Sequence, residues 1–164
     1  MPIKYKISGL LALALALLWL VSLLMPLNVP DDTFTTLTGR KIALKGLRGK
    51  PVVVTFWATD CPSCIKEIPD LIAIYQQYHK QGLELIAVNM YYDPPSHVVD
   101  TASALQLPYP VALDITGGHA QRFGGVYLTP STFVINPDGA ITRRYTGTFD
   151  PVELSTHIEN LLKG

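Results

Sequence analysis

The chain has 164 residues with 13 basic and 13 acidic side chains, and 48% of its residues are hydrophobic. This length favours one domain, and the zero net charge argues against a protein that holds nucleic acid by neutralising phosphates. The apolar content combined with low net charge also excludes a disordered chain.

The first element along the chain is an uncharged, apolar stretch of 19 residues, 7–25. As a helix it would be about 28 Å long, close to the hydrocarbon core of a bilayer. Two lysines lie before it in residues 1–6, and Asp31 and Asp32 follow it, so the positive-inside rule predicts a cytoplasmic N-terminus. The stretch lacks the small residues of a signal-peptidase site. We therefore expect an uncleaved transmembrane signal anchor in a bacterial inner membrane, with the rest of the chain outside the cytoplasm.

A folded domain is expected over residues 34–164, after a short linker at 26–33 that contains two prolines and two acids. Phe34–Leu37 and Lys41–Leu44 predict a small hairpin. Val52–Trp57 is apolar at most positions on both faces, which is typical of a buried parallel strand.

Helical periodicity follows over Pro62–His79, with Pro69 inside the pattern, where it should kink the helix. Gly82 ends this helix, and Leu83–Met90 predicts a second buried strand. A strand, a helix and another strand in succession indicate an α/β fold with a parallel sheet and crossover helices.

The C-terminal half alternates short elements. The expected elements are a helix at 96–106, a short strand at 111–113, one or two helical turns at 118–123, a hairpin of 131–136 with 140–146, and a final helix at 150–162. An Asn-Pro-Asp-Gly turn joins the two hairpin strands, and Asp150 with Pro151 gives the final helix an N-cap and a first residue.

The two cysteines of the chain, Cys61 and Cys64, lie where the first buried strand ends and the helix begins. This places Cys61 at the helix cap and Cys64 one turn inside, so the two sulfur atoms face each other. The free N–H groups and the dipole of a helix N-terminus also favour a thiolate.

Three other roles for this cysteine pair are weaker. A structural cross-link would close only a four-residue loop and contribute about 2 kcal/mol, against nearly 5 kcal/mol for a 100-residue loop. A zinc site needs about four ligands, and the four histidines are scattered singly. Two inert buried thiols would need protection in an oxidising compartment. The strand and helix context favours a redox-active dithiol, with no metal and no cofactor beyond the disulfide itself.

With these residues in view, the chain resembles the thioredoxin superfamily, and within it the membrane-anchored TlpA, ResA and CcmG (DsbE)-like thiol-disulfide oxidoreductases. The resemblance rests on V-V-V-T-F-W-A-T-D-C-P-S-C at 52–64, Pro69, G-V-Y-L-T-P-S-T-F-V-I at 125–135 and N-P-D-G at 136–139. It implies a thioredoxin fold with a central mixed sheet flanked by helices. The expected fold also has the N-terminal hairpin and a βα insertion, and the extra helix and short strand between about residues 96 and 113 resemble the insertion of that branch.

The resemblance also implies roles for individual residues. Cys61 corresponds to the exposed nucleophile and Cys64 to the buried resolving thiol. Pro130 corresponds to a cis-proline facing the dithiol, although sequence alone would predict a trans bond. The backbone of Thr129 would then pair with an extended substrate peptide; the alternative is a simple turn that opens a strand.

Glu67 lies three residues after Cys64, on the same helix face. It matches a carboxylate that ResA and CcmG-like proteins keep near the buried thiol, where it would exchange protons with that thiol. The alternative is a solvated glutamate in the first helical turns. Trp57 is a candidate substrate-binding residue, and packing is an equally good explanation for it.

Two positions depart from the family pattern. Asp60 replaces the second tryptophan usual before the nucleophile, and a carboxylate there should repel a Cys61 thiolate and alter the surface that meets partners. Thr55 replaces the buried acid of cytoplasmic thioredoxins, which leaves more of the proton transfer to Glu67.

The function expected from the resemblance is reduction of disulfides in partner proteins, with apocytochrome c as the leading substrate during cytochrome c maturation. A membrane electron donor of the DsbD or CcdA type would reduce the cysteine pair again. The alternatives are a reductase or an oxidant for other periplasmic proteins, or a chaperone that binds Cu(I) through the dithiol.

Overall fold

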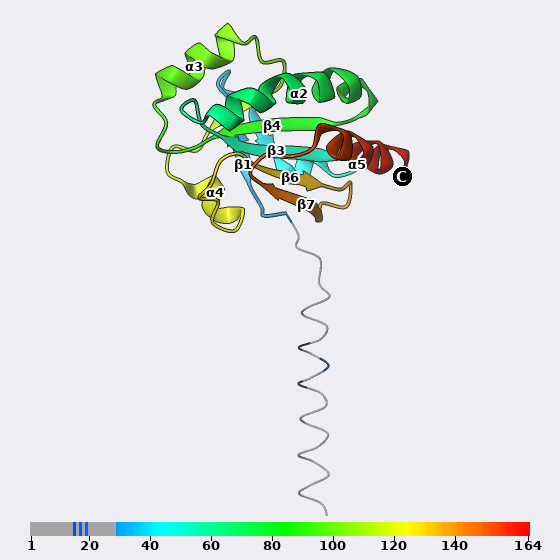
Figure 1. Cartoon of the computed structure of the whole chain (residues 1–164). Coiled ribbons are helices and arrows are strands. Elements are labelled where there is room, and N and C mark those ends of the chain that lie inside the picture. Colours follow the sequence, from blue (N-terminus) through cyan, green and yellow to red (C-terminus); the bar gives the residue numbers. More distant parts are fainter. Residues whose placement is uncertain (1–14, 16, 18, 20–28) are drawn as a thin grey trace, which may run out of the picture.

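The computed structural model describes residues 29–164, together with Leu15, Leu17 and Trp19. A five-stranded mixed sheet forms its centre, in the order β5-β4-β3-β6-β7 (Figure 1). The strands are β3 (Val52–Trp57), β4 (Glu84–Asn89), β5 (Val111–Leu113), β6 (Ser131–Ile135) and β7 (Ile141–Thr146).

Strand β3 is the central strand, and all six of its residues are buried. It runs parallel to β4 and antiparallel to β6, which in turn pairs antiparallel with β7. Parallel β5 closes the other edge beside β4. The sheet is therefore mixed, as the family resemblance implies.

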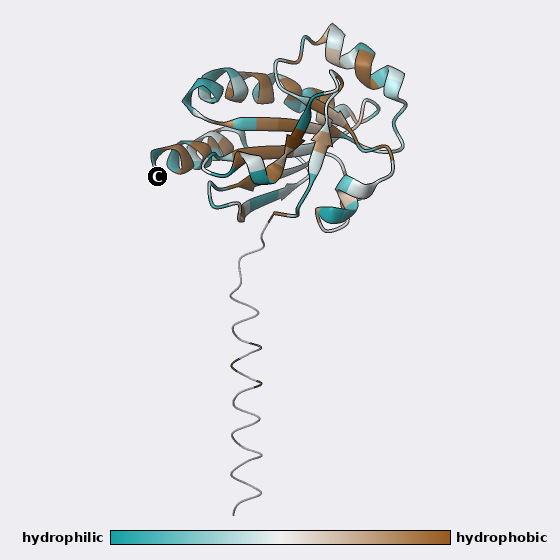
Figure 2. Cartoon of the chain, turned by 180° about the vertical axis from the view of Figure 1, so that it is seen from behind, coloured by the Kyte–Doolittle hydropathy of each residue, from teal (hydrophilic) through white to brown (hydrophobic). Residues whose placement is uncertain are grey.

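The two faces of the sheet carry separate apolar cores. Val53 and Trp57 of β3 pack with residues of α2 (Pro62–Tyr78) and α5 (Pro151–Lys163) on one face. Val54 and Phe56 alternate with them and pack on the opposite face with the N-terminal hairpin and the α4 region. In Figure 2 the apolar colouring concentrates along the strands between these covering elements. Burial on both faces explains why β3 and β4 are apolar throughout most of their length.

The predicted N-terminal hairpin is confirmed as a separate two-stranded sheet, β1 (Thr33–Thr35) with β2 (Lys41–Ala43). An isolated bridge from Thr36 to Ala112 and a hydrogen bond from the Leu37 amide to the Val111 carbonyl attach it to the β5 edge. A short 3₁₀ helix, η1 (Leu44–Leu47), follows the hairpin.

The observed helices begin and end within a few residues of the predicted bounds. Helix α2 ends at Tyr78, and a 3₁₀ turn, η2 (His79–Gln81), continues to Gly82, whose φ of 116° stops the helical path. Pro69 lies inside α2 without ending it. The remaining helices are α3 (Pro95–Ala104), α4 (Gly118–Arg122) and α5. The N-cap prediction for α5 is confirmed, because the Asp150 carboxylate accepts the amides of Val152 and Glu153.

The predicted membrane segment at 7–25 lies outside the described residues except for Leu15, Leu17 and Trp19, which are helical and exposed. Within the described part of the chain, no helix combines the length and the apolar character needed to cross a bilayer. The signal anchor therefore stays a prediction from the sequence.

Candidate active site

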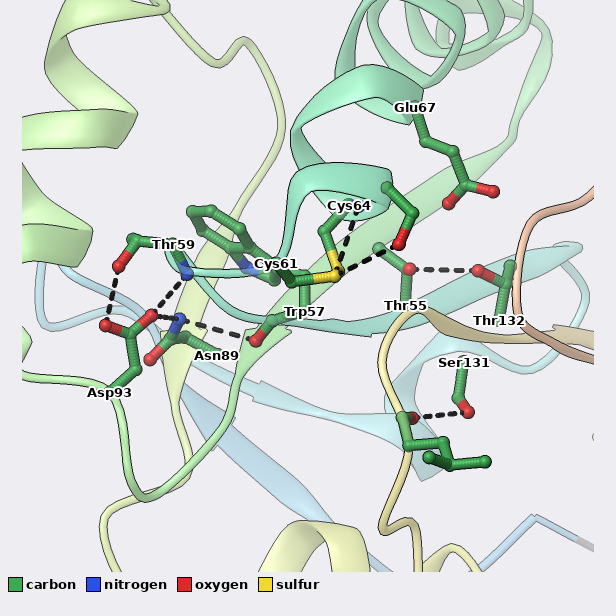
Figure 3. The surroundings of a disulfide bond; sticks show 12 residues. Thr55, Trp57, Thr59, Cys61, Cys64, Glu67, Asn89, Asp93, Ser131 and Thr132 are labelled. Atoms are coloured by element: carbon green, nitrogen blue, oxygen red, sulfur yellow. Dashed lines mark hydrogen bonds between the residues drawn. A yellow bond between two sulfur atoms is a disulfide. The ribbon is translucent and has the colours of Figure 1, made fainter.

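The two cysteines form a disulfide at the start of α2, where the carboxyl end of β3 meets the helix (Figure 3). Cys61 is the N-cap residue of α2, and its Sγ accepts the Cys64 amide at 3.2 Å. Ser63 Oγ lies 3.3 Å from the same sulfur atom. Cys61 is partly exposed, whereas Cys64 is only 2% exposed. A sulfur atom of another molecule can therefore reach Cys61 from solvent, while Cys64 is shielded by the fold.

A carboxylate holds the loop that leads into Cys61. Asp93, buried after β4, accepts the Thr59 amide at 2.6 Å and the Thr59 hydroxyl at 2.7 Å. Asn89 donates to the same carboxylate at 2.7 Å and to the Trp57 carbonyl at 3.4 Å. These bonds connect the loop after β3 to the loop after β4, so the position of the nucleophile depends on both strand ends.

Glu67 lies one turn after Cys64 on α2, and it is only 5% exposed (Figure 3). Its Oε1 accepts the Phe149 amide at 2.9 Å, just before α5. Burial raises the pKa of Glu67 to about 7, the Asp70 carboxylate adds to this rise, and the Phe149 amide opposes it. The structure therefore excludes the alternative of a solvated glutamate, since this carboxyl group is buried.

A small cavity brings most of the predicted site residues together. Cys64, Glu67, Trp57 and Pro130 all contribute to its lining, and so does Thr55. The Thr129–Pro130 peptide bond is cis, and the cis-proline is buried beside the dithiol helix. Thr129, the residue before Pro130, is partly exposed.

The side chain of Trp57 is only 4% exposed and packs in the core beneath α2. Its Nε1 is one of two buried side-chain nitrogen or oxygen atoms without a hydrogen-bond partner among the described residues. This burial favours packing, and contact with a substrate stays a prediction.

Thr55, at the position of the buried acid in cytoplasmic thioredoxins, shares a hydrogen bond of 2.9 Å with Thr132 (Figure 3). The two residues are direct partners in the β3–β6 register. A neutral hydroxyl pair thus occupies the sheet below the dithiol, and Glu67 is the titratable carboxyl group in the cavity lining.

Thr132, Asn89 and Asp93 are site residues that the sequence reasoning missed. Thr132 could have been found from the antiparallel pairing of the strand after the cis-proline with β3. Asp93 follows a buried strand, as ligand-binding and loop-positioning carboxylates often do, but nothing in the sequence links it to Thr59. Among the described residues, no cluster of three or more His, Cys, Asp or Glu side chains could hold a metal ion.

Comparison with known proteins identifies the family to which this chain belongs. The Redoxin family profile matches residues 27–161. The thiol-disulfide oxidoreductase ResA of Geobacillus thermodenitrificans (strain NG80-2) is 33% identical over 134 residues, covering 82% of this chain and 76% of the relative. ResA of Bacillus thuringiensis subsp. konkukian (strain 97-27) is 32% identical over the same length and the same shares of both chains.

Solved structures share the fold. A thiol:disulfide interchange protein of the thioredoxin family from Chlorobium tepidum TLS superposes with a TM-score of 0.77 at 24% identity, covering 84% of this chain and 97% of its own. StoA from Bacillus subtilis gives a TM-score of 0.67 at 24% identity, covering 76% and 93%. These structures support the thioredoxin fold, with its central mixed sheet and flanking helices.

Proposed function

The chain belongs to the redoxin family as a ResA-like thiol-disulfide oxidoreductase of the thioredoxin superfamily, and we propose that it acts as a reductase for disulfides in proteins outside the cytoplasm. One observation carries the proposal: Cys61 is partly exposed at a helix N-terminus, while its partner Cys64 is buried. Such asymmetry suits attack by the first thiol and release by the second.

In the proposed reaction the reduced Cys61 thiolate attacks one sulfur atom of a substrate disulfide. The substrate S–S bond breaks, a substrate thiolate leaves, and a mixed disulfide joins Cys61 to the other substrate sulfur. The Cys64 thiolate then attacks the Cys61 sulfur atom and expels the second substrate thiolate. Two electrons pass to the substrate, and the protein ends with the Cys61–Cys64 disulfide.

Glu67 would move the proton that the second step requires. Cys64 must lose its thiol proton before it attacks, and the Glu67 carboxylate, which lines the same cavity, would accept that proton. A pKa of about 7 lets this carboxyl group both accept and release a proton near neutral pH.

The substrate chain would lie against the segment before the cis-proline. The backbone of Thr129, a partly exposed residue, would hydrogen-bond to an extended peptide beside Cys61. Apocytochrome c is the proposed client, and a membrane electron donor of the DsbD or CcdA type would reduce the disulfide again. With the signal anchor predicted for residues 7–25, these steps would occur at the outer face of a bacterial inner membrane.

Two cysteine variants test the proposed reductase. We expect Cys61→Ser to abolish reduction of a protein disulfide, because no nucleophile remains at the exposed position. We expect Cys64→Ala to accumulate the mixed disulfide, because the second step is lost. Both variants should be assayed as the full-length protein in detergent, with a disulfide-containing client and gel analysis without reductant. A Cys61→Ser protein with full activity would contradict the mechanism.

A further inference from the structure

Asp60 is an exposed carboxylate directly before the nucleophile in the sequence. It is a central residue of the turn from Ala58 to Cys61, which is closed by a hydrogen bond of 3.3 Å from the Cys61 amide to the Ala58 carbonyl. The side chain is exposed, and it makes no hydrogen bond or ion pair with any described residue.

The backbone that carries Asp60 is held on both sides. Its predecessor Thr59 is bound through both its amide and its hydroxyl to the buried Asp93 carboxylate. Its successor Cys61 caps α2 and accepts the Cys64 amide. Because both neighbours are held in this way, the backbone of Asp60 has a fixed place in the turn directly before the nucleophile.

Asp60 forms no ion pair with a basic side chain among the described residues. The basic residue nearest in sequence, Lys66, lies on α2 beyond Cys64 and forms no ion pair with Asp60. Arg122 of α4 is already bound to the buried Asp32 at 2.8 Å. The exposed residues before the cis-proline, Tyr127 and Leu128, carry no charge.

We propose that Asp60 is a specificity-determining residue that selects substrates with a basic residue beside the disulfide under attack. This inference rests on the proposed reductase function. During attack, negative charge moves from Cys61 to the leaving substrate sulfur atom, and the neighbouring residue Asp60 adds a second negative charge to this exposed surface. A Lys or Arg side chain of the substrate would offset the repulsion between these like charges. An acidic substrate segment would add to it.

The expected size follows from ion pairs at exposed sites. Such a pair corresponds to a change of about two- to fivefold in a rate. Exchanging Lys for Glu in the substrate removes the attraction to Asp60 and also adds a repulsion, so both effects enter the rate ratio. Asp60 should therefore account for about a fivefold preference at low ionic strength. Salt near 1 M shortens the screening length to about 3 Å and should remove most of it.

The test uses two peptides with one internal disulfide, identical except for Lys or Glu directly before the first cysteine. The full-length protein is reduced in advance, and single-turnover rates are measured for both peptides at low and high salt. Each rate is divided by the rate with dithiothreitol, which removes differences in intrinsic reactivity. The variants are Asp60→Ser, the charge reversal Asp60→Lys, and the matched control Asp138→Ser in the exposed turn between β6 and β7.

We expect the wild-type protein and Asp138→Ser to share one Lys-to-Glu rate ratio. Asp60→Ser should lower that ratio about fivefold, and Asp60→Lys should lower it further. An Asp60→Ser ratio within the error of the wild-type ratio would overturn the assignment of Asp60, even though both peptides are reduced. If the wild-type protein reduces neither peptide and no protein disulfide, the reductase function itself fails.

Discussion

Glu67 is a carboxyl group whose ionisation is coupled to folding. Burial raises its pKa to about 7 in the folded protein, against 4.5 for the free side chain. Between these two values the folded state keeps a proton that the unfolded state has lost. The free energy of unfolding therefore falls as pH rises through this window. Above about pH 7 the folded state carries the full destabilisation from a buried, ionised Glu67.

We expect Glu67→Gln to remove this pH dependence from the oxidised protein. The amide oxygen of Gln can still accept the Phe149 amide, so the variant changes the charge and keeps the hydrogen bond. Between pH 5 and pH 8 the wild-type free energy of unfolding should fall by about 2 kcal/mol more than that of the variant. Urea denaturation at both pH values measures the difference, and parallel curves for the two proteins would show that Glu67 ionises normally.

At the residue scale, the sequence predicts what depends on local spacing. The position of Cys61 at the helix cap follows from the boundary between strand and helix, and the three-residue spacing places Glu67 on the Cys64 face of the helix. The burial of Glu67 depends on the packing of distant segments and did not follow from spacing. The Thr55–Thr132 bond joins residues 77 positions apart, and only the strand register brings them together. The cis bond at Pro130 was implied by family resemblance, because the local sequence favours trans.

At the scale of elements, β3, β4, β5 and α5 were predicted almost to the residue. Their signals are strong: continuous apolar runs for buried strands, and Asp150-Pro151 at a helix start. The attachment of the N-terminal hairpin to β5 was not predicted, because it consists of one bridge and one backbone bond between distant segments. Backbone pairing between distant segments depends little on side-chain type, so the sequence pattern does not reveal it.

The link between the loops after β3 and β4 gives a prediction at this scale. Asp93→Ala removes the acceptor of both Thr59 bonds and leaves the Asn89 amide without that partner. We expect the free energy of unfolding to fall by about 2 to 3 kcal/mol. The Thr59 amide should also exchange with solvent much faster, while amides in the core of β3 change only with global stability.

Asp100→Ala is the matched control for this loop, because Asp100 is exposed on α3 and forms no ion pair in the described structure. Its effect on unfolding should stay within about 0.5 kcal/mol. Hydrogen exchange followed by NMR separates the two variants residue by residue. Unchanged protection at Thr59 in Asp93→Ala would show that the turn holds its shape without the carboxylate.

At the scale of the whole molecule, the chain has two parts with different chemistry. The apolar stretch at 7–25 accounts for much of the overall hydrophobicity, whereas residues 26–164 carry 11 of the 13 basic residues and all 13 acidic ones. Asp32, within the predicted linker at 26–33, is buried and bound by His119 at 2.7 Å and by Arg122 at 2.8 Å. The folded domain therefore already includes the end of the predicted linker, because Asp32 is bound to α4 and β1 begins at Thr33.

This arrangement predicts on which side of the membrane the dithiol lies. Cys61 and Cys64 are the only cysteines of the chain, so a thiol label reports solely on the domain. After reduction, we expect a membrane-impermeant maleimide to label the full-length protein in intact spheroplasts, because the lysines before the anchor keep the N-terminus inside. Replacing Lys4 and Lys6 by Glu should lower the labelled fraction by weakening that orientation signal. Labelling that requires permeabilised membranes would instead place the domain in the cytoplasm. Glutathione and thioredoxin already keep thiols reduced there, so this result would contradict the proposed role as a reductase outside the cytoplasm.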